Sequence, residues 1–238
     1  MLQAAEPSHP CTSPNALLRS LHPADQRLLS PHLASVALKA GEVVERSGVS
    51  ASTIFFPETA VISVLDGAGE ASRPDLGVIG REGMVGWTIL LGDCQATTTA
   101  VVRVPGTSLA IRPKPLVRAS HLSKSLQAAL LGFVHDFMGQ MAGTIVSSAE
   151  SLERRVARWL ILLHDRTEGD ALALTHDHIC SALHVRRASV TDTVHVLEGY
   201  GALKCSRSRI VVRDRARLEL AAGVPARISP AAATPLRS

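Results

Sequence analysis

The stretch 175-THDHICSALHVRRASVTDTVHVLEGYGALKCSRSRIVVRD-214 places two adjacent arginines at the start of an amphipathic segment and follows that segment with a basic strand pair. Thr175 is a favourable helix N-cap residue, so a first short helix is expected to begin there. After a break at residues 184–185, an apolar stripe recurs at four- and three-residue spacing, formed by Val190, Val194 and Leu197. The pattern predicts two helices joined by a tight turn, with glycines ending the second helix.

The second predicted helix carries a polar face opposite its apolar stripe. Arg187, Thr191 and His195 share this face at four-residue steps, flanked by Ala188 and Asp192. A guanidinium at the start of such a helix can make a bidentate contact with guanine, and its polar neighbours can meet other base edges in the major groove. For this role, we expect the side chain at position 187 to be exposed and free of an acidic partner.

A basic strand pair follows the second helix. The segment 203-LKCSRSRIVVRD-214 predicts strand, tight turn and strand, with side chains placed to grip backbone phosphate. Residues 186–217 hold eight Lys and Arg against three Asp and Glu, a net charge of +5, whereas residues 1–149 hold eleven of each sign. Helix, turn and wing in this order predict a winged helix-turn-helix that binds double-stranded DNA; the alternative is a basic surface that is merely solvated. The predicted DNA-contacting residues are Thr175, Arg186, Arg187, Ser189, Thr191, Asp192, His195, Lys204, Arg207 and Arg209.

The sequence upstream of residue 149 has a different pattern of apolar residues. Leucines at helical spacing over 15–38 predict short helices, and Val-, Ile- and Thr-rich runs between residues 39 and 112 predict an antiparallel sheet or small barrel. From about Leu122, apolar residues at three- and four-residue steps predict a long helix over 122–148. Gly132, Gly139 and Gly143 lie near one face of that helix, which favours close approach of a second copy; the alternative is a weak helix packed on its own sheet.

These changes divide the chain into five parts. We expect a flexible N-terminus (1–14), a sensor domain (15–119), a dimerisation helix (120–148), a winged helix-turn-helix domain (149–221) and a disordered, Ala- and Pro-rich tail (222–238). Hydrophobic residues make up 46% and charged residues 19% of the 238, a normal globular balance. Aromatic residues are only 3%, which argues against reading single-stranded RNA by stacking.

The segment 175–214 resembles the DNA-binding domain of the Crp/Fnr family of bacterial transcription regulators. The upstream runs 40-AGEVVERSG-48 and 77-GVIGREGMVG-86 resemble that family's cyclic-nucleotide-binding-like β-roll, and 122–148 resembles its dimer helix. The resemblance covers roughly residues 15–220. It implies an α+β fold with an N-terminal antiparallel β-roll (a jelly roll), a long dimerisation helix and a C-terminal winged helix-turn-helix. It also implies a homodimer on a palindromic operator, with RNA polymerase as a further candidate partner.

The chain departs from the members of that family that bind cyclic AMP. Met84 stands where their ribose-binding glutamate would be, and Thr98 stands roughly where their phosphate-binding arginine would be. A buried phosphate without a cation is costly, so ordinary cyclic AMP binding is not expected and the effector is unknown. The iron-sulfur members need an N-terminal cysteine cluster, and only Cys11 is available. The candidate effector-pocket residues are Gly83, Met84, Gly86, Thr98 and Thr99.

Other chemistry finds little support in the sequence. No GxSxG or HExxH motif occurs, so we expect no enzyme, no catalytic residue and no bound metal or cofactor. His176, Cys180 and His184 step by four, but Cys180 is better explained as a packing residue, as is Cys205 in the wing. Scattered cysteines and the short apolar run 159–163 predict a cytoplasmic protein without a membrane span. The alternative function is a ligand-sensing module whose C-terminal domain mediates protein–protein contact.

Overall fold

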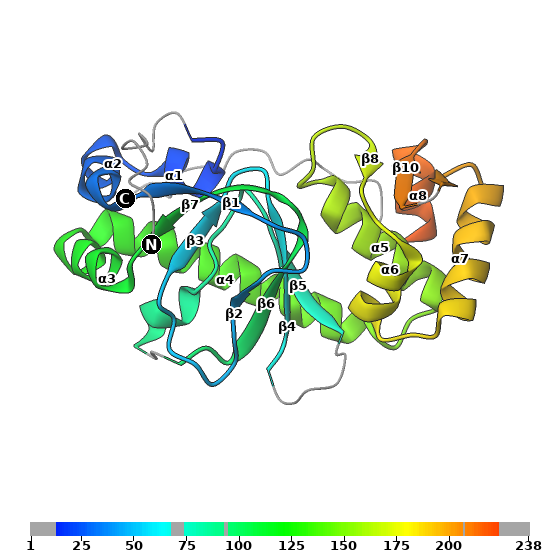
Figure 1. Ribbon diagram of the computed structural model, residues 1–238, viewed down its shortest axis with the longest axis horizontal. Helices are drawn as coiled ribbons and strands as arrows, with labels where there is room; N and C mark the ends of the chain where they lie inside the picture. The colour runs from blue at the N-terminus through cyan, green and yellow to red at the C-terminus, as the bar shows by residue number, and fades with distance from the viewer. Residues whose placement is uncertain (1–12, 68–73, 93–94, 207, 224–238) are drawn as a thin grey trace, which may run out of the picture.

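The computed structural model describes residues 13–67, 74–92, 95–206 and 208–223 (Figure 1). Most of the predicted N-terminal segment and C-terminal tail lie outside these ranges. The α-helices are α1 (Ala16–Ser20), α2 (Pro23–Leu29), α3 (Pro113–Leu122), α4 (Lys124–Ser147), α5 (Leu152–His164), α6 (His176–Leu183), α7 (Arg187–Gly199) and α8 (Arg215–Ala221), with 3-10 turns η2 (Ser30–His32) and η3 (Trp87–Leu91). The strands are β1 (Ala34–Leu38), β2 (Val43–Glu45), β3 (Ile54–Pro57), β4 (Val61–Asp66), β5 (Asp75–Ile79), β6 (Thr98–Val104), β7 (Gly106–Ile111), β8 (Ala171–Leu172), β9 (Leu203–Ser206) and β10 (Arg209–Val212).

Two antiparallel sheets form the N-terminal roll. Their strand orders are β1-β7-β3 and β2-β6-β4-β5. Ile62 and Val64 on β4 point into the roll core, as expected for a strand with alternating faces. Val61 on the opposite face belongs to the core of the C-terminal domain, so β4 is buried on both sides. The predicted antiparallel roll is therefore present, and the second domain covers its outer face.

One local prediction upstream of the long helix is wrong, and one helix there was not predicted. Residues 34–38 were expected to be helical, but they form β1, which pairs with β7 from Ala34↔Ala110 to Leu38↔Gly106. Their alternating burial has the two-residue period of a strand, which the leucine spacing concealed. Residues 113–122 form α3, a helix that the sequence analysis did not assign. Ser123 separates it from α4 and, with Ser125, donates a hydrogen bond to the Asp25 carboxylate on α2.

The long helix α4 runs behind the roll in Figure 1 and connects the two domains. Its buried side chains, Leu126, Leu130, Phe133, Val134 and Phe137, pack into the core of its own roll. The stripe that suggested a second copy therefore contacts the same chain over most of its length. The glycines at 132, 139 and 143 are exposed, and a Cβ at any of them would meet no neighbour within 4 Å.

The C-terminal domain packs α5–α8 on a small sheet of order β8-β10-β9, and it docks on the roll through a buried polar junction. Asp75 on β5 accepts hydrogen bonds from Trp159 Nε1 on α5 (2.9 Å) and from Arg103 Nη2 on β6 (2.9 Å), and also from Ser63 on β4. A second bond joins Arg166 Nε to Glu82 Oε1 at 2.6 Å. These contacts fix one arrangement of the domains.

Candidate nucleic-acid interface

The helix pair at the C-terminal end is set by a capping box and a left-handed turn. Thr175 accepts from the His178 backbone amide, while the His178 side chain accepts from the Thr175 amide. The helix α6 ends at His184, which has φ 51°, a conformation that few residues other than glycine adopt. Arg186 then stands at the N-cap of α7 in extended geometry. This turn directs the start of α7 away from the domain core.

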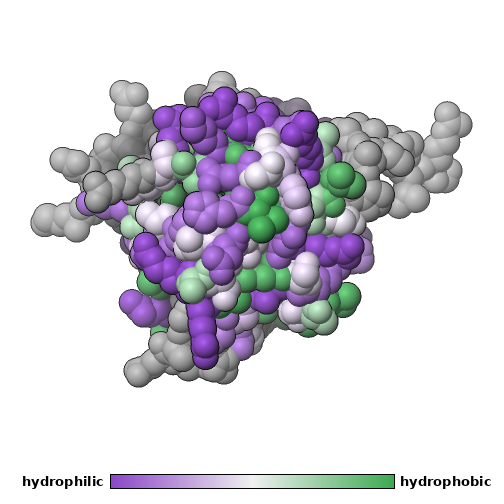
Figure 2. Space-filling view, turned by 90° about the vertical axis from the view of Figure 1, so that its right-hand side faces the viewer, coloured by the Kyte–Doolittle hydropathy of each residue, from purple (hydrophilic) through white to green (hydrophobic). Residues whose placement is uncertain are grey.

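The buried face of α7 is formed by the three apolar residues that the sequence predicted. Val190, Val194 and Leu197 are all at most 1% exposed. Figure 2 looks onto the end of the molecule that carries α7, and hydrophilic residues cover most of that face. The predicted contact residues that are exposed on α7 and the wing are Arg186, Arg187, Ser189, Asp192, His195, Lys204 and Arg209. The structure therefore brings most of the predicted residues to one end of the molecule.

Arg187 does not meet one expectation. Its side chain is 65% exposed, but its guanidinium forms an ion pair with Asp177 on α6, which is 66% exposed. The hydrogen bond and the charge of Asp177 raise the pKa of Arg187. An ion pair between two such exposed side chains is screened and adds little to stability. The acidic partner holds Arg187 at the helix start without burying it, so phosphate or a base edge can still replace the carboxylate.

The side chains of two predicted DNA-contact residues form hydrogen bonds within the domain. Thr175 is half-buried, and its hydroxyl caps α6. Thr191 is also half-buried; its hydroxyl donates to the Arg187 carbonyl (3.1 Å) and lies 3.3 Å from His176 Nδ1. Their side chains are less available to DNA than the sequence pattern indicated.

The wing is the hairpin β9–β10, with Ser206 paired to Arg209 across the turn. Lys204 and Arg209 are exposed, whereas the predicted contact residue Arg207 lies outside the described residues. Cys205 is half-buried; burial and the nearby Glu198 raise the pKa of its thiol to about 12. At neutral pH this thiol is protonated, in keeping with a packing role.

Three of the predicted effector-pocket residues serve packing. Met84 is fully buried in the roll core, and a side chain at Gly83 would collide with the Phe133 ring of α4. Gly86 has φ 90°, and a Cβ added there would collide with Ile54 Cδ1, so glycine is required. Thr99 is half-buried, and its hydroxyl accepts from the Ser47 amide at 3.3 Å.

The roll interior contains a carboxylate that the sequence analysis did not single out. Glu45 on β2 is 8% exposed, and its Oε2 has no hydrogen-bond partner among the described residues. Burial raises the pKa of Glu45 to about 7, and nearby Thr98 partly opposes this shift, although Thr98 Oγ1 also lacks a well-formed hydrogen bond. Glu45 lies in the quoted run 40–48, but nothing in that run distinguishes it from an exposed strand residue. The ionised form of Glu45 disfavours an anionic ligand here.

The described part of the chain contains no group of three or more His, Cys, Asp or Glu side chains placed to hold a metal ion. Within the same residues, each helix is too short or too polar to cross a bilayer.

Comparison with known proteins identifies a known domain at residues 154–221 and a shared overall fold. Residues 154–221 match the model of the Crp-like helix-turn-helix domain. The structure of FixK2 from Bradyrhizobium japonicum is similar at 15% identity, with a TM-score of 0.69 over 82% of this chain and 99% of that one. A CRP-family transcriptional regulator from Thermus thermophilus is 19% identical, with a TM-score of 0.65 over 79% and 96%. The c-di-GMP-responsive global regulator CLP of Xanthomonas campestris is 15% identical, with a TM-score of 0.61 over 80% and 99%. No curated protein sequence matches this chain.

Proposed function

We propose that this chain, which contains a Crp-like helix-turn-helix domain and has the overall fold of the Crp/Fnr regulators, is a sequence-specific DNA-binding regulator of transcription. The family match and the shared fold confirm the Crp/Fnr resemblance and the fold class expected from the sequence. The chain's own chemistry then supplies the details of how it would bind DNA.

The observation that carries the proposal is the exposed basic surface of α7 and the wing. The first turn of α7 presents Arg186 and Arg187 to solvent, and Lys204 and Arg209 stand on the adjacent hairpin. We assign Arg187 to a base edge in the major groove and the wing cations to phosphate. Asp192 and His195, one and two turns further along α7, would meet neighbouring bases. Thr175 and Thr191 would act by holding the helices in place.

We further propose that the protein acts as a homodimer through the outward face of α4. Met138, Ile145 and Val146 on this helix are 53%, 58% and 77% exposed, and several exposed apolar side chains on one helix are a candidate interface. The exposed glycines on the same helix allow a second helix to approach closely. Two copies would place their α7 helices in successive major grooves, about 34 Å apart, on a palindromic operator.

The roll would act as the sensor of the dimer. Met84 packs in the core, and the interior presents Glu45 in place of a phosphate-binding cation. We therefore expect no tight cyclic AMP site. An effector would act by changing the relative position of the two α7 helices, a shift between two dimer arrangements.

The remaining assignments follow from a regulator's role. The structures that resemble this chain are transcription regulators, so we propose a non-enzymatic protein that works in the cytoplasm, where its operator DNA lies. RNA polymerase is the partner on which a DNA-bound regulator of this kind would act.

Selection of bound genomic fragments by the full-length protein tests the proposal. We expect enrichment of an inverted repeat, with affinity that falls steeply between 50 and 200 mM salt because bound phosphates release counterions (about one ion per contact). Failure to enrich any sequence, or affinity that does not change with salt, would favour a C-terminal domain that contacts protein instead.

A further inference from the structure

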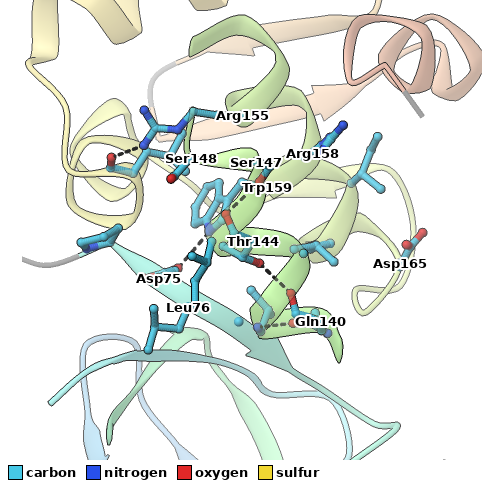
Figure 3. A pocket seen from close by; sticks show the side chains of 18 of the residues that line it. Asp75, Leu76, Gln140, Thr144, Ser147, Ser148, Arg155, Arg158, Trp159 and Asp165 are labelled. Carbon is cyan, nitrogen blue, oxygen red and sulfur yellow. Dashed lines mark hydrogen bonds between the residues drawn. The ribbon is translucent and has the colours of Figure 1, made fainter. Parts of the chain in front are cut away.

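A pocket of about 650 Å³ lies at the junction of the two domains (Figure 3). Its walls come from β5 of the roll, the last turns of α4, and α5 of the C-terminal domain. This volume is within the range of pockets that hold small molecules, roughly 300 to 1,000 Å³. The pocket lies outside the roll interior, where the candidate effector residues were expected.

The body of the pocket is apolar. Leu76, Val78, Ile161 and Leu162 line it together with the ring of Trp159, which stands near its centre in Figure 3. The indole N–H of Trp159 is already bonded to Asp75, so the ring offers the pocket an apolar face. The ion pair with Arg103 neutralises the charge of Asp75, so Asp75 does not require a cationic ligand.

One lining cation is left without an acidic partner. Arg158 pairs with Glu150 at 3.0 Å, Arg166 with Glu82 at 2.6 Å, and Asp165 with Arg215 at 2.7 Å. Arg155 on α5 has no carboxylate within 4 Å in the described parts of the chain; its Nη2 donates to the Leu183 carbonyl at 2.7 Å. A guanidinium has five N–H donors, so several remain for a ligand.

A second donor lies across the pocket from Arg155 in Figure 3. Gln140 on α4 uses its Oε1 to accept from the Val78 amide at 2.7 Å. Because Oε1 accepts from Val78, the side-chain NH₂ of Gln140 points away from Val78 and can donate to a ligand acceptor. The pocket therefore combines apolar walls with hydrogen-bond donors and a net positive charge.

We propose that this interdomain pocket binds a small apolar molecule with one anionic group, with the anion at Arg155 and the apolar body against Trp159. Such a ligand would touch both domains at once, and Arg155 also contacts the end of α6, the first helix of the helix-turn-helix. Because the pocket is formed by this particular arrangement of the domains, the ligand stabilises that arrangement over others.

Titration of the full-length protein with 8-anilinonaphthalene-1-sulfonate, a fluorescent apolar anion, tests the site. We expect saturable binding of one probe per chain, weakened tenfold or more by Arg155→Gln, which removes the charge. Gly143→Leu should weaken it similarly by filling the pocket, because a Cβ at Gly143 meets no neighbour within 4 Å and the helix can accept it.

Matched variants control for charge and for the glycine change. Arg118→Gln removes an exposed charge on α3, and Gly199→Leu makes the same substitution at the exposed end of α7, away from the pocket and from the outward face of α4. Both should bind the probe like the parent protein. Unsaturable binding, or parental affinity in either Arg155→Gln or Gly143→Leu, would overturn the proposal. The assay contains no DNA, so its failure leaves the proposed regulator function standing, and failure to bind an operator leaves this site standing.

Discussion

The guanidinium of Arg187 at the start of α7 pairs with the carboxylate of Asp177 on α6, and about two-thirds of each side chain is exposed. The pair links the two helices of the helix-turn-helix at its solvent face. Because both groups are hydrated, the pair can open without uncovering a buried charge. We interpret Asp177 as a placeholder that orients Arg187 until DNA replaces the carboxylate.

Asp177→Asn should raise affinity for DNA by roughly 2- to 10-fold at low salt, because it removes a negative charge beside the phosphates and frees Arg187. Fluorescence anisotropy with labelled operator measures this change. Asp170→Asn is a matched control, since Asp170 is 70% exposed and pairs with His164 away from α7. Equal or weaker binding by Asp177→Asn would contradict the placeholder interpretation.

The stability of the folded chain should depend strongly on Asp75, which is buried where the two domains meet. Asp75→Ala leaves Arg103, which is 10% exposed, buried without its partner, and breaking such a pair costs about 3 to 5 kcal/mol. Glu150→Ala breaks a half-exposed pair with Arg158 and should cost about 1 kcal/mol or less. Urea unfolding at one pH measures the free energy of unfolding of the parent protein and of both variants. Similar losses in the two variants would show that the buried Asp75–Arg103 pair does not stabilise the fold more than an exposed pair does.

Glu45 should make the stability of the roll depend on pH. Its pKa is about 7 in the folded chain against 4.5 when unfolded, so folding favours the protonated form. The associated stability is fully present below pH 4.5 and is lost as the pH rises to about 7, a loss on the order of 3 kcal/mol. Glu45→Gln should remove this dependence.

Urea unfolding at pH 5 and pH 8 measures the effect. Glu45→Gln should be more stable than the parent at pH 8, and the difference should shrink at pH 5. A constant difference at both pH values would mean that the Glu45 carboxyl does not titrate in this range.

The outward face of α4 should hold the dimer. Met138→Glu places a charge on this face and should shift the protein towards monomers in sedimentation velocity, with a parallel loss of operator affinity. Leu91→Glu is the matched control, because Leu91 on η3 is 55% exposed, close to the 53% of Met138. A dimer that survives Met138→Glu unchanged would place the interface elsewhere.

The helix-turn-helix was predictable because its pattern is local. The apolar spacing of α7 and the basic hairpin depend on neighbours within about thirty residues, and the structure has both elements at the expected positions. The short strand β1 was missed because its leucine-rich sequence fits two periods, and only pairing with β7, some seventy residues away, decides between them.

Several polar contacts of the structure depend on residues or turns that the local sequence pattern does not reveal. The pairing of Asp75 with Trp159 spans 84 residues, and the orphan oxygen of Glu45 depends on how β2 packs in the roll. The Arg187–Asp177 pair joins residues only ten apart, but it depends on the turn geometry at His184. Residue type alone predicts none of these contacts.

The most direct test of DNA reading compares the parent protein with Arg187→Ala on the selected operator and on its single-base variants. We predict that Arg187→Ala loses roughly 5- to 150-fold in affinity for the operator and no longer discriminates at one position of each half-site. Arg118→Ala should behave like the parent. An Arg187→Ala protein that ranks every operator variant as the parent does would contradict the assignment of this side chain to a base edge.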